Sequence, residues 1–112
     1  MKKRPDPITV LAERAAEAAE ALRVLANQHR LLLLCHLSSG ERSVGELVDQ
    51  LQISQANVSQ HLAKLRTGGM VATRREGTTI YYRLADEQAE QLIDMLCERF
   101  GPPAAARRRS AS

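Results

Sequence analysis

The spacing of apolar residues near the N-terminus predicts a helix with a single packing seam. From about Val10 to Leu25, apolar residues recur at steps of four and three, at Leu11, Ala15, Ala18, Leu22 and Leu25. This heptad spacing is typical of a helix that packs along one side against another helix. Because the alanines permit a close approach, we expect the partner helix to come from a second subunit. Packing on the chain's own core is the alternative.

Two further helices are predicted from apolar runs that begin at capping residues. Asn27 can cap a helix that reads QHRLLLLCHLSS, and its consecutive leucines place it at the centre of the core. Ser43 and Glu46 have the spacing of a capping box, in which the serine oxygen and the glutamate carboxylate satisfy free amides at the start of VGELVDQL. A short helix is therefore expected to begin at this box.

The following helix completes a helix-turn-helix. After a two-residue turn, Ser54 can cap a helix that reads QANVSQHLAKLRTG and ends at a glycine pair. Two short helices joined by so tight a turn are the helix-turn-helix arrangement. This pair is the first feature of the chain that indicates nucleic-acid binding.

A hairpin and a last helix complete the predicted fold. MVATRR and TIYYRL carry alternating, β-branched and aromatic residues on either side of a turn at Gly77, which predicts two paired strands. Asp86 can cap a last helix that ends before Gly101. The predicted fold class is mainly α with a small β-hairpin: a homodimeric winged helix-turn-helix of five helices and a two-stranded wing.

Length and composition favour a single domain. The chain has 112 residues, of which 44% are hydrophobic, and we assign residues 9–100 to one winged helix-turn-helix domain for DNA binding and dimerisation. Residues 1–8 are expected to be a flexible basic N-terminal segment, and residues 101–112 a flexible basic C-terminal tail. No apolar run approaches a membrane span and no signal-peptide pattern is present, so we expect a cytoplasmic protein with no membrane partner.

The charges are sorted along the chain. Residues 54–85 contain five basic residues and one acidic residue, whereas residues 86–98 contain five acidic residues and no basic one. Only the first of these segments has the charge to face phosphates. The formal net charge of +3 conceals this division.

The helix after Ser54 has one face suited to the major groove. On a helical wheel, Val58, Leu62 and Leu65 share the core side, whereas the opposite side is small, amide-rich and singly basic. Amides read base edges, small residues permit close approach, and lysine meets phosphate. An ordinary solvated face is the alternative interpretation. The candidate DNA-binding residues of this helix and its start are Ser54, Gln55, Asn57, Ser59, Gln60 and Lys64.

The hairpin adds further candidate contacts. Arg74 and Arg75, with Arg83 on the second strand, have the charge to follow the phosphate backbone. Thr78, beside Gly77, is expected at the tip that approaches the minor groove. Solvated strand arginines are the alternative. We expect His61, at the edge of the core face, to pack or to bond backbone rather than to contact a base.

These residues resemble a known family. The run LRVLANQHRLLLLCHL, followed by SVGELVDQLQISQANVSQHLAKLRTGGMVATRREGTTIYYRL, resembles the ArsR/SmtB family of winged-helix repressors over nearly the whole expected domain. The resemblance implies a homodimer formed through the first and last helices. It further implies that the dimer binds double-stranded operator DNA of imperfect dyad symmetry and releases it when an inducer binds.

The inducer is the open question, because many members of that family bind metals. The family's cysteine-rich motif would fall on residues 43–51, which contain no cysteine, and its last-helix site would fall on residues 86–99, which contain no histidine. We therefore expect no metal site of a known kind and no cofactor. An atypical site that uses Cys35 and His36 is left open.

Cys35 and Cys97 are the two cysteines of the chain. Cysteine at an apolar helical position most often fills the core, and a permanent structural disulfide is not expected in the cytoplasm. Their placement, however, resembles the sulfide- and redox-responsive branch typified by BigR and SqrR, which implies that the two thiols react together. The predicted function is a repressor whose operator affinity falls on oxidation or persulfidation of this pair, with a reactive sulfur species or another thiol oxidant as inducer.

Two other functional classes are alternatives. A winged helix can serve as a protein-interaction module, but the amide-rich face and basic hairpin argue against it. An enzyme is not expected, because the chain has no paired carboxylates, nucleophile–base set or glycine-rich phosphate loop.

Overall fold

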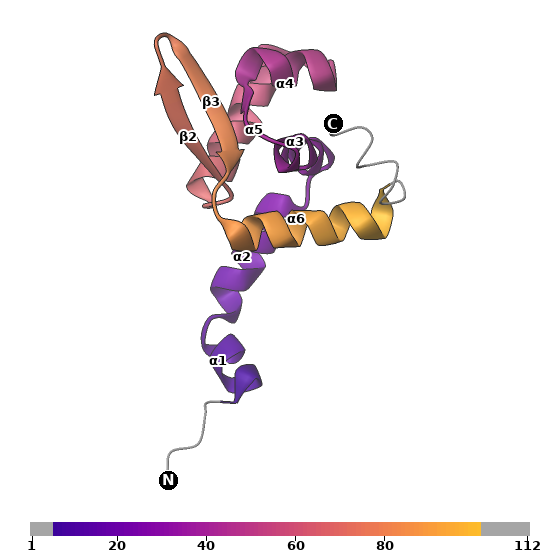
Figure 1. Ribbon diagram of the computed structural model, residues 1–112. Helices are drawn as coiled ribbons and strands as arrows, with labels where there is room; N and C mark the ends of the chain where they lie inside the picture. The colour runs from indigo at the N-terminus through magenta and orange to yellow at the C-terminus, as the bar shows by residue number, and fades with distance from the viewer. Residues whose placement is uncertain (1–5, 102–112) are drawn as a thin grey trace.

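The computed structural model describes residues 6–101 as six helices and a small sheet (Figure 1). The predictions for residues 1–5 and 102–112 lie outside the described range. No helix within residues 6–101 has the length and apolar character to cross a membrane. The elements are, in chain order, α1 Pro7–Glu13, α2 Ala15–Leu25, α3 Gln28–Ser38, β1 Arg42–Ser43, α4 Val44–Leu51, α5 Gln55–Thr67, β2 Val71–Glu76, β3 Thr79–Leu84 and α6 Glu87–Phe100.

The N-terminal seam forms two helices rather than the one expected. Arg14 leaves the helical region, with φ −115° and ψ 14°, and its amide donates to the carbonyl of Leu11. Helix α1 begins at Pro7, capped by Asp6, within the segment that the sequence assigned to a flexible end. Of the side chains in α1 and α2, only Leu25 is buried. Since helices gain most of their stability from packing, the other described residues do little to hold this N-terminal arm as one continuous helix. In Figure 1 it projects away from the body.

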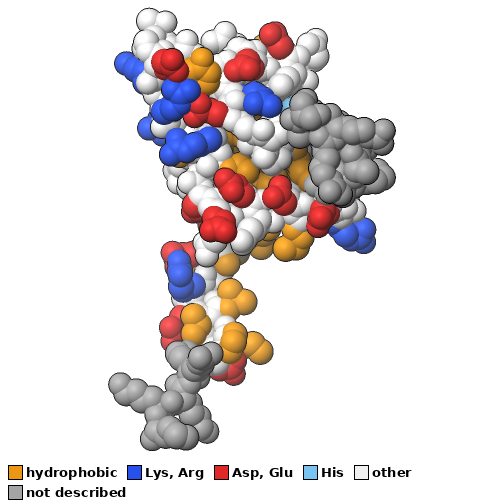
Figure 2. All heavy atoms as spheres, viewed as in Figure 1, with side chains coloured by type: hydrophobic (Ala, Val, Ile, Leu, Met, Phe, Trp, Pro, Cys, Tyr) orange, Lys and Arg blue, Asp and Glu red, His pale blue; other side chains and the backbone are white. Residues whose placement is uncertain are grey.

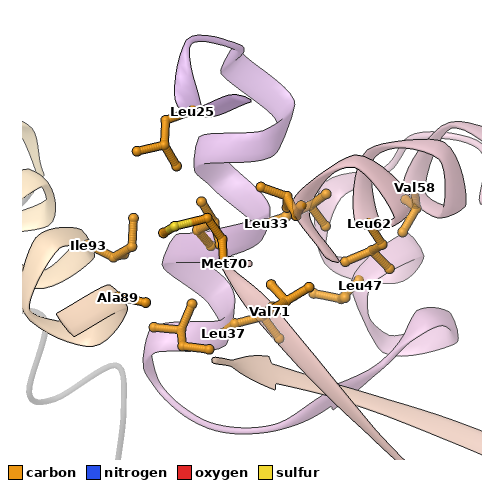
Figure 3. Close-up of a cluster of buried hydrophobic side chains, with 13 residues drawn as sticks. Leu25, Leu33, Leu37, Leu47, Val58, Leu62, Met70, Val71, Ala89 and Ile93 are labelled. Carbon is orange, nitrogen blue, oxygen red and sulfur yellow. The ribbon is translucent and has the colours of Figure 1, made fainter. Parts of the chain in front are cut away.

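Helix α3 lies at the centre of the core, as its leucines predicted. Leu33 and Leu34 are fully buried, and Leu37 is nearly so. Figure 3 shows side chains from α2, α4, α5, β2 and α6 converging on this helix. Asn27 Oδ1 accepts the amides of His29 and Arg30, so the predicted cap is confirmed. The helix that carries Cys35 is therefore fixed from several directions.

The predicted caps also position the helix-turn-helix. Ser43 and Glu46 form the capping box of α4, and Ser54 Oγ accepts the amide of Asn57 at the start of α5. Between the two helices, Gln52 takes a left-handed conformation with φ 58°. This residue closes α4 and turns the chain toward α5 within three positions.

The wing belongs to a sheet of three strands, one more than expected. Strands β2 and β3 pair antiparallel from Val71 opposite Leu84 to Glu76 opposite Thr79. Gly77, with φ 62°, makes the turn. Strand β1 pairs with the other edge of β3, giving the order β1-β3-β2. The link between α3 and α4 thus covers an edge that a two-stranded wing would leave open.

Candidate DNA interface and thiol pair

Helix α5 presents one apolar and one polar face, as predicted. Val58, Leu62 and Leu65 are fully buried. The positions opposite them, which are small, amide-bearing or basic, are all exposed: Ala56, Asn57, Ser59, Gln60, Ala63 and Lys64. We call these six positions the reading face. It is free to approach a groove while the opposite side of the helix holds it to the core.

The residues at the start of α5 can both cap the helix and donate hydrogen bonds to DNA. Ser54 accepts the amide of Asn57 through its oxygen, at 3.1 Å, and its hydroxyl proton is left to donate elsewhere. Gln55 is exposed at the first helical position. Since free amides gather at a helix start, this end favours an anion.

The wing arginines differ in their surroundings. Arg74 donates to Glu41 Oε1 at 2.7 Å and to Glu76 Oε2 at 2.8 Å, and its guanidinium lies 4.6 Å from the centre of the Tyr81 ring. Hydrogen bonds to these two carboxylates raise the pKa of Arg74 above its usual value. Arg75, Arg83 and Thr78 are exposed. A phosphate would therefore compete for Arg74 with two carboxylates.

Helices α3 and α5 bring two histidines together. The rings of His29 and His61 are 5.6 Å apart between centroids and meet edge to face. Burial lowers the pKa of His61 below its usual value, and the positive charges of Arg30, His29 and Lys64 lower it further. Sequence analysis did not predict a joint role for these residues, because spacing along separate helices does not reveal which side chains meet.

Helices α3 and α6 bring the two cysteines together. Cys35 Sγ and Cys97 Sγ are 3.0 Å apart, and both residues are half-buried against the core. A disulfide bond is about 2.05 Å long, so bonding requires the two sulfurs to approach by only about 1 Å. Cys35 lies in the last turn of α3, where Ser38 Oγ donates to its carbonyl at 2.6 Å. In the last turn of α6, the Gly101 amide donates to the Cys97 carbonyl.

Metal-binding side chains do not gather in the part of the chain that the structure describes. Within residues 6–101, no three of the His, Cys, Asp and Glu side chains lie close enough to hold an ion. Burial and the charge of Arg42 lower the pKa of His36, the residue next to Cys35.

Helix-turn-helix, wing and an exposed amide-rich helix face together define a winged helix-turn-helix transcriptional regulator. The family model described as "Bacterial regulatory protein, arsR family" matches residues 27–73. The biofilm growth-associated repressor of Agrobacterium fabrum is 46% identical over 97 residues, which are 87% of this chain and 83% of that protein. The chain belongs to the ArsR family.

Solved structures agree with this assignment. The transcriptional repressor BigR from Xylella fastidiosa matches with a TM-score of 0.75 and 42% identity, over 85% of this chain and 97% of that one. The homodimeric winged helix-turn-helix domain Mb0332 from Mycobacterium bovis matches with a TM-score of 0.71 and 33% identity, over 86% of each chain. The predicted family and fold class are therefore confirmed.

Proposed function

We propose that this protein is a homodimeric cytoplasmic repressor that leaves its operator when Cys35 and Cys97 become covalently joined. The observation that carries this proposal is the distance of 3.0 Å between the two sulfurs, which belong to separate helices. Core filling alone does not require two thiols to meet. The repressor direction is supported by the names of the two relatives, one a biofilm growth-associated repressor and the other a transcriptional repressor.

The reading face and wing supply the proposed DNA contacts. Two copies of α5 would enter successive major grooves of an operator with dyad symmetry, since a two-fold dimer matches a two-fold site. Side chains of α5 and its start would read bases and bind phosphates, and the wing would follow the backbone. The proposed contacts are Ser54, Gln55, Asn57, Ser59, Gln60, Lys64, Arg74, Arg75 and Thr78.

Exposed apolar side chains support a dimer formed through the first and last helices. In α1 and α2, Ile8, Leu11 and Leu22 are 76%, 59% and 62% exposed, and in α6 Met95 and Phe100 are 63% and 77% exposed. Figure 2 shows apolar side chains along the N-terminal arm and at the edge of the body beside it. Burying such side chains against a second copy would stabilise the dimer through the hydrophobic effect.

The proposed switch is a two-electron oxidation of the thiols. With a hydropolysulfide as oxidant, one thiolate attacks a sulfur of the reagent, which becomes a cysteine persulfide as a shorter sulfide anion leaves. The second thiolate then attacks the cysteine-bound sulfur, and hydrosulfide leaves as the disulfide forms. Both thiols lose their protons, and the reagent's sulfur is reduced. A bridge with one added sulfur forms when the cysteine persulfide anion first attacks a second equivalent of polysulfide and gains one sulfur as a shorter sulfide anion leaves. The second thiolate then attacks the middle sulfur of that chain, and hydrosulfide leaves.

A bridge would connect α3, at the centre of the core, to α6, which is one of the proposed dimer helices. Cys35 is in α3, which packs against α5 as well as α6. Drawing α3 and α6 together would change how each reading face is held relative to the proposed dimer helix. Since both half-sites must be engaged at a fixed spacing, a small change would lower operator affinity.

The test is an operator-binding titration with the full chain. Cys35→Ser and Cys97→Ser should each bind the protein's own promoter as wild type does in dithiothreitol, because neither thiol lies on the reading face. Polysulfide should release wild type and neither variant, and dithiothreitol should restore binding because the bridge is reversible.

A chelator control and two further outcomes of the titration separate the alternatives. A chelator should leave release unchanged; release that requires a metal ion would favour an atypical site with Cys35 and His36. Equal binding of oxidised wild type and both variants would mean that the thiols only fill the core. Absence of DNA binding in reduced wild type would favour a protein-interaction module.

A further inference from the structure

A second cationic surface borders the reading face. It consists of His29 and Arg30 from the first turn of α3 together with His61 and Lys64 of α5, and we call it the α3–α5 cluster. His29 and His61 are in ring contact. Lys64 belongs to the reading face, and His61 follows Gln60 of that face directly. The cluster is therefore continuous with the surface proposed to enter the groove.

No carboxylate of the described residues forms an ion pair with this cluster. The charged groups that act on His61 are Arg30, His29 and Lys64, all of them positive or capable of becoming so. Among residues 6–101, Arg14, Arg23 and Arg74 form ion pairs with carboxylates, whereas none of the four cluster residues does. Like charges gathered without a counter-charge repel one another, and a bound anion would relieve that repulsion.

Two nitrogen atoms in the cluster also lack hydrogen-bond partners. Arg30 Nε and His61 Nδ1 are both buried, and neither has a partner among the described residues. Buried polar atoms are satisfied in most native structures, so each exception calls for an explanation. Without a partner, Nδ1 favours the tautomer whose proton is on Nε2, which leaves His61 one N–H to donate.

We propose that the α3–α5 cluster binds a phosphate of the DNA backbone beside the groove that α5 enters. Arg30 supplies charge and a planar set of donors, which suits a phosphate better than a single ammonium group does. His61 donates a hydrogen bond, and Lys64 adds charge from the reading face. The proposal rests on the proposed DNA-binding function, and it extends the interface to a helix outside the helix-turn-helix.

The bound phosphate would also couple DNA binding to protons. A phosphate anion beside His61 favours the charged imidazolium, so the pKa of His61 is higher in the complex than in the free protein. The complex therefore takes up protons. The gain in affinity is full below the pKa of the free protein and is lost as pH rises through the pKa of the complex. From about pH 8 to about pH 6, the dissociation constant should fall, by at most about tenfold per pH unit for each proton taken up.

The experiment measures binding of the full chain to a random-sequence duplex of about 30 base pairs. This length accommodates the α5 helices of both subunits of a dimer. Arg30→Gln should weaken binding to any duplex by about tenfold or more. It should also reduce the slope of log K against log salt by about 0.9 for each subunit. Arg30→Lys keeps the charge and should keep the slope. Arg23→Gln removes an equal charge from α2, where Arg23 is bonded to Glu20, and should change neither quantity.

The pH dependence of binding is measured for wild type and His61→Gln only, and a thermal melt of each confirms that it is folded. Wild type should bind more tightly on acidification, and His61→Gln should lose part of that dependence. An unchanged salt slope in Arg30→Gln, or identical pH profiles of wild type and His61→Gln, would overturn the proposal. If wild type binds no duplex, the proposed function itself fails; if wild type binds and Arg30→Gln equals it, only the phosphate site fails.

Discussion

Individual side chains on the surface of α5 divide by chemistry into readers and anchors. Asn57 and Gln60 carry an amide with both a donor and an acceptor, which can form paired hydrogen bonds with a base edge. Lys64 carries only donors and a full charge, which suits phosphate. All three are exposed on a helix whose opposite face is fully buried. Their orientation therefore depends on the core and not on flexible loops.

Replacing the amides should affect sequence reading alone. Asn57→Ala and Gln60→Ala should each weaken operator binding by about 1–3 kcal/mol, because a base edge loses its paired hydrogen bonds. Binding to random duplex should change little, and the melting temperature should not fall. Gln50→Ala, on the exposed surface of α4 and outside the reading face, is the matched control. Equal gel shifts for Gln60→Ala and the control would remove this face from the groove.

At the scale of elements, Arg74 connects the wing to the turn that follows α3. Its bonds reach Glu41, which is 33 residues away in sequence, and Glu76 on its own strand. Exposed ion pairs contribute about 0–1 kcal/mol to stability, so this contact has little effect on folding. Its larger effect is on charge, because two carboxylates lie where the wing would approach phosphates.

Removing one of these carboxylates should strengthen binding to any duplex. In Glu41→Gln, Arg74 loses a charged partner and phosphate loses a repelling neighbour, so affinity should rise several-fold at low salt with little change in melting temperature. Asp94→Asn on α6 makes the same change in net charge away from the wing. Weaker binding in Glu41→Gln than in Asp94→Asn would mean instead that Glu41 holds the wing in its binding position.

At the scale of the whole molecule, the described chain is a compact body with an unsupported arm. Helices α1 and α2 bury only Leu25 (Figure 1). Ala18 lies in a shallow groove between them with Val10, Leu11 and Ala21. An arm of this kind gains stability when a second copy covers it.

A charge in this groove should dissociate the dimer. Ala18→Glu would place a carboxylate against the apolar side chains of the groove, where the one lining cation, Arg14, is already bonded to Glu17, at a cost of several kcal/mol unless the new charge is paired. Sedimentation should give monomers, and operator affinity should fall because a monomer has one reading face and contacts one half-site. Ala16→Glu, on the opposite side of α2, should leave the dimer intact. A wild type that sediments as a monomer would refute the two-headed arrangement.

Features that depend on neighbouring residues could be predicted from the sequence. Caps at Asn27, Ser43, Ser54 and Asp86 were predicted and are present, because a cap is a contact between residues two or three positions apart. The buried and exposed sides of α5 follow from the helical period in the same way. The family resemblance rests on these same local runs, and it suggested the pairing of the thiols.

Tertiary structure alone decided which distant groups meet. The sulfurs of Cys35 and Cys97 are separated by 62 positions in sequence, and no spacing rule gives their distance. Glu41 with Arg74, and His29 with His61, likewise meet only through packing. The break at Arg14 and the third strand were not predicted, since both depend on what lies beside the chain. Local hydrogen bonds and the helical periodicity can be predicted from the sequence, because they involve residues close together in the chain. Contacts between elements form only when the elements pack around the core.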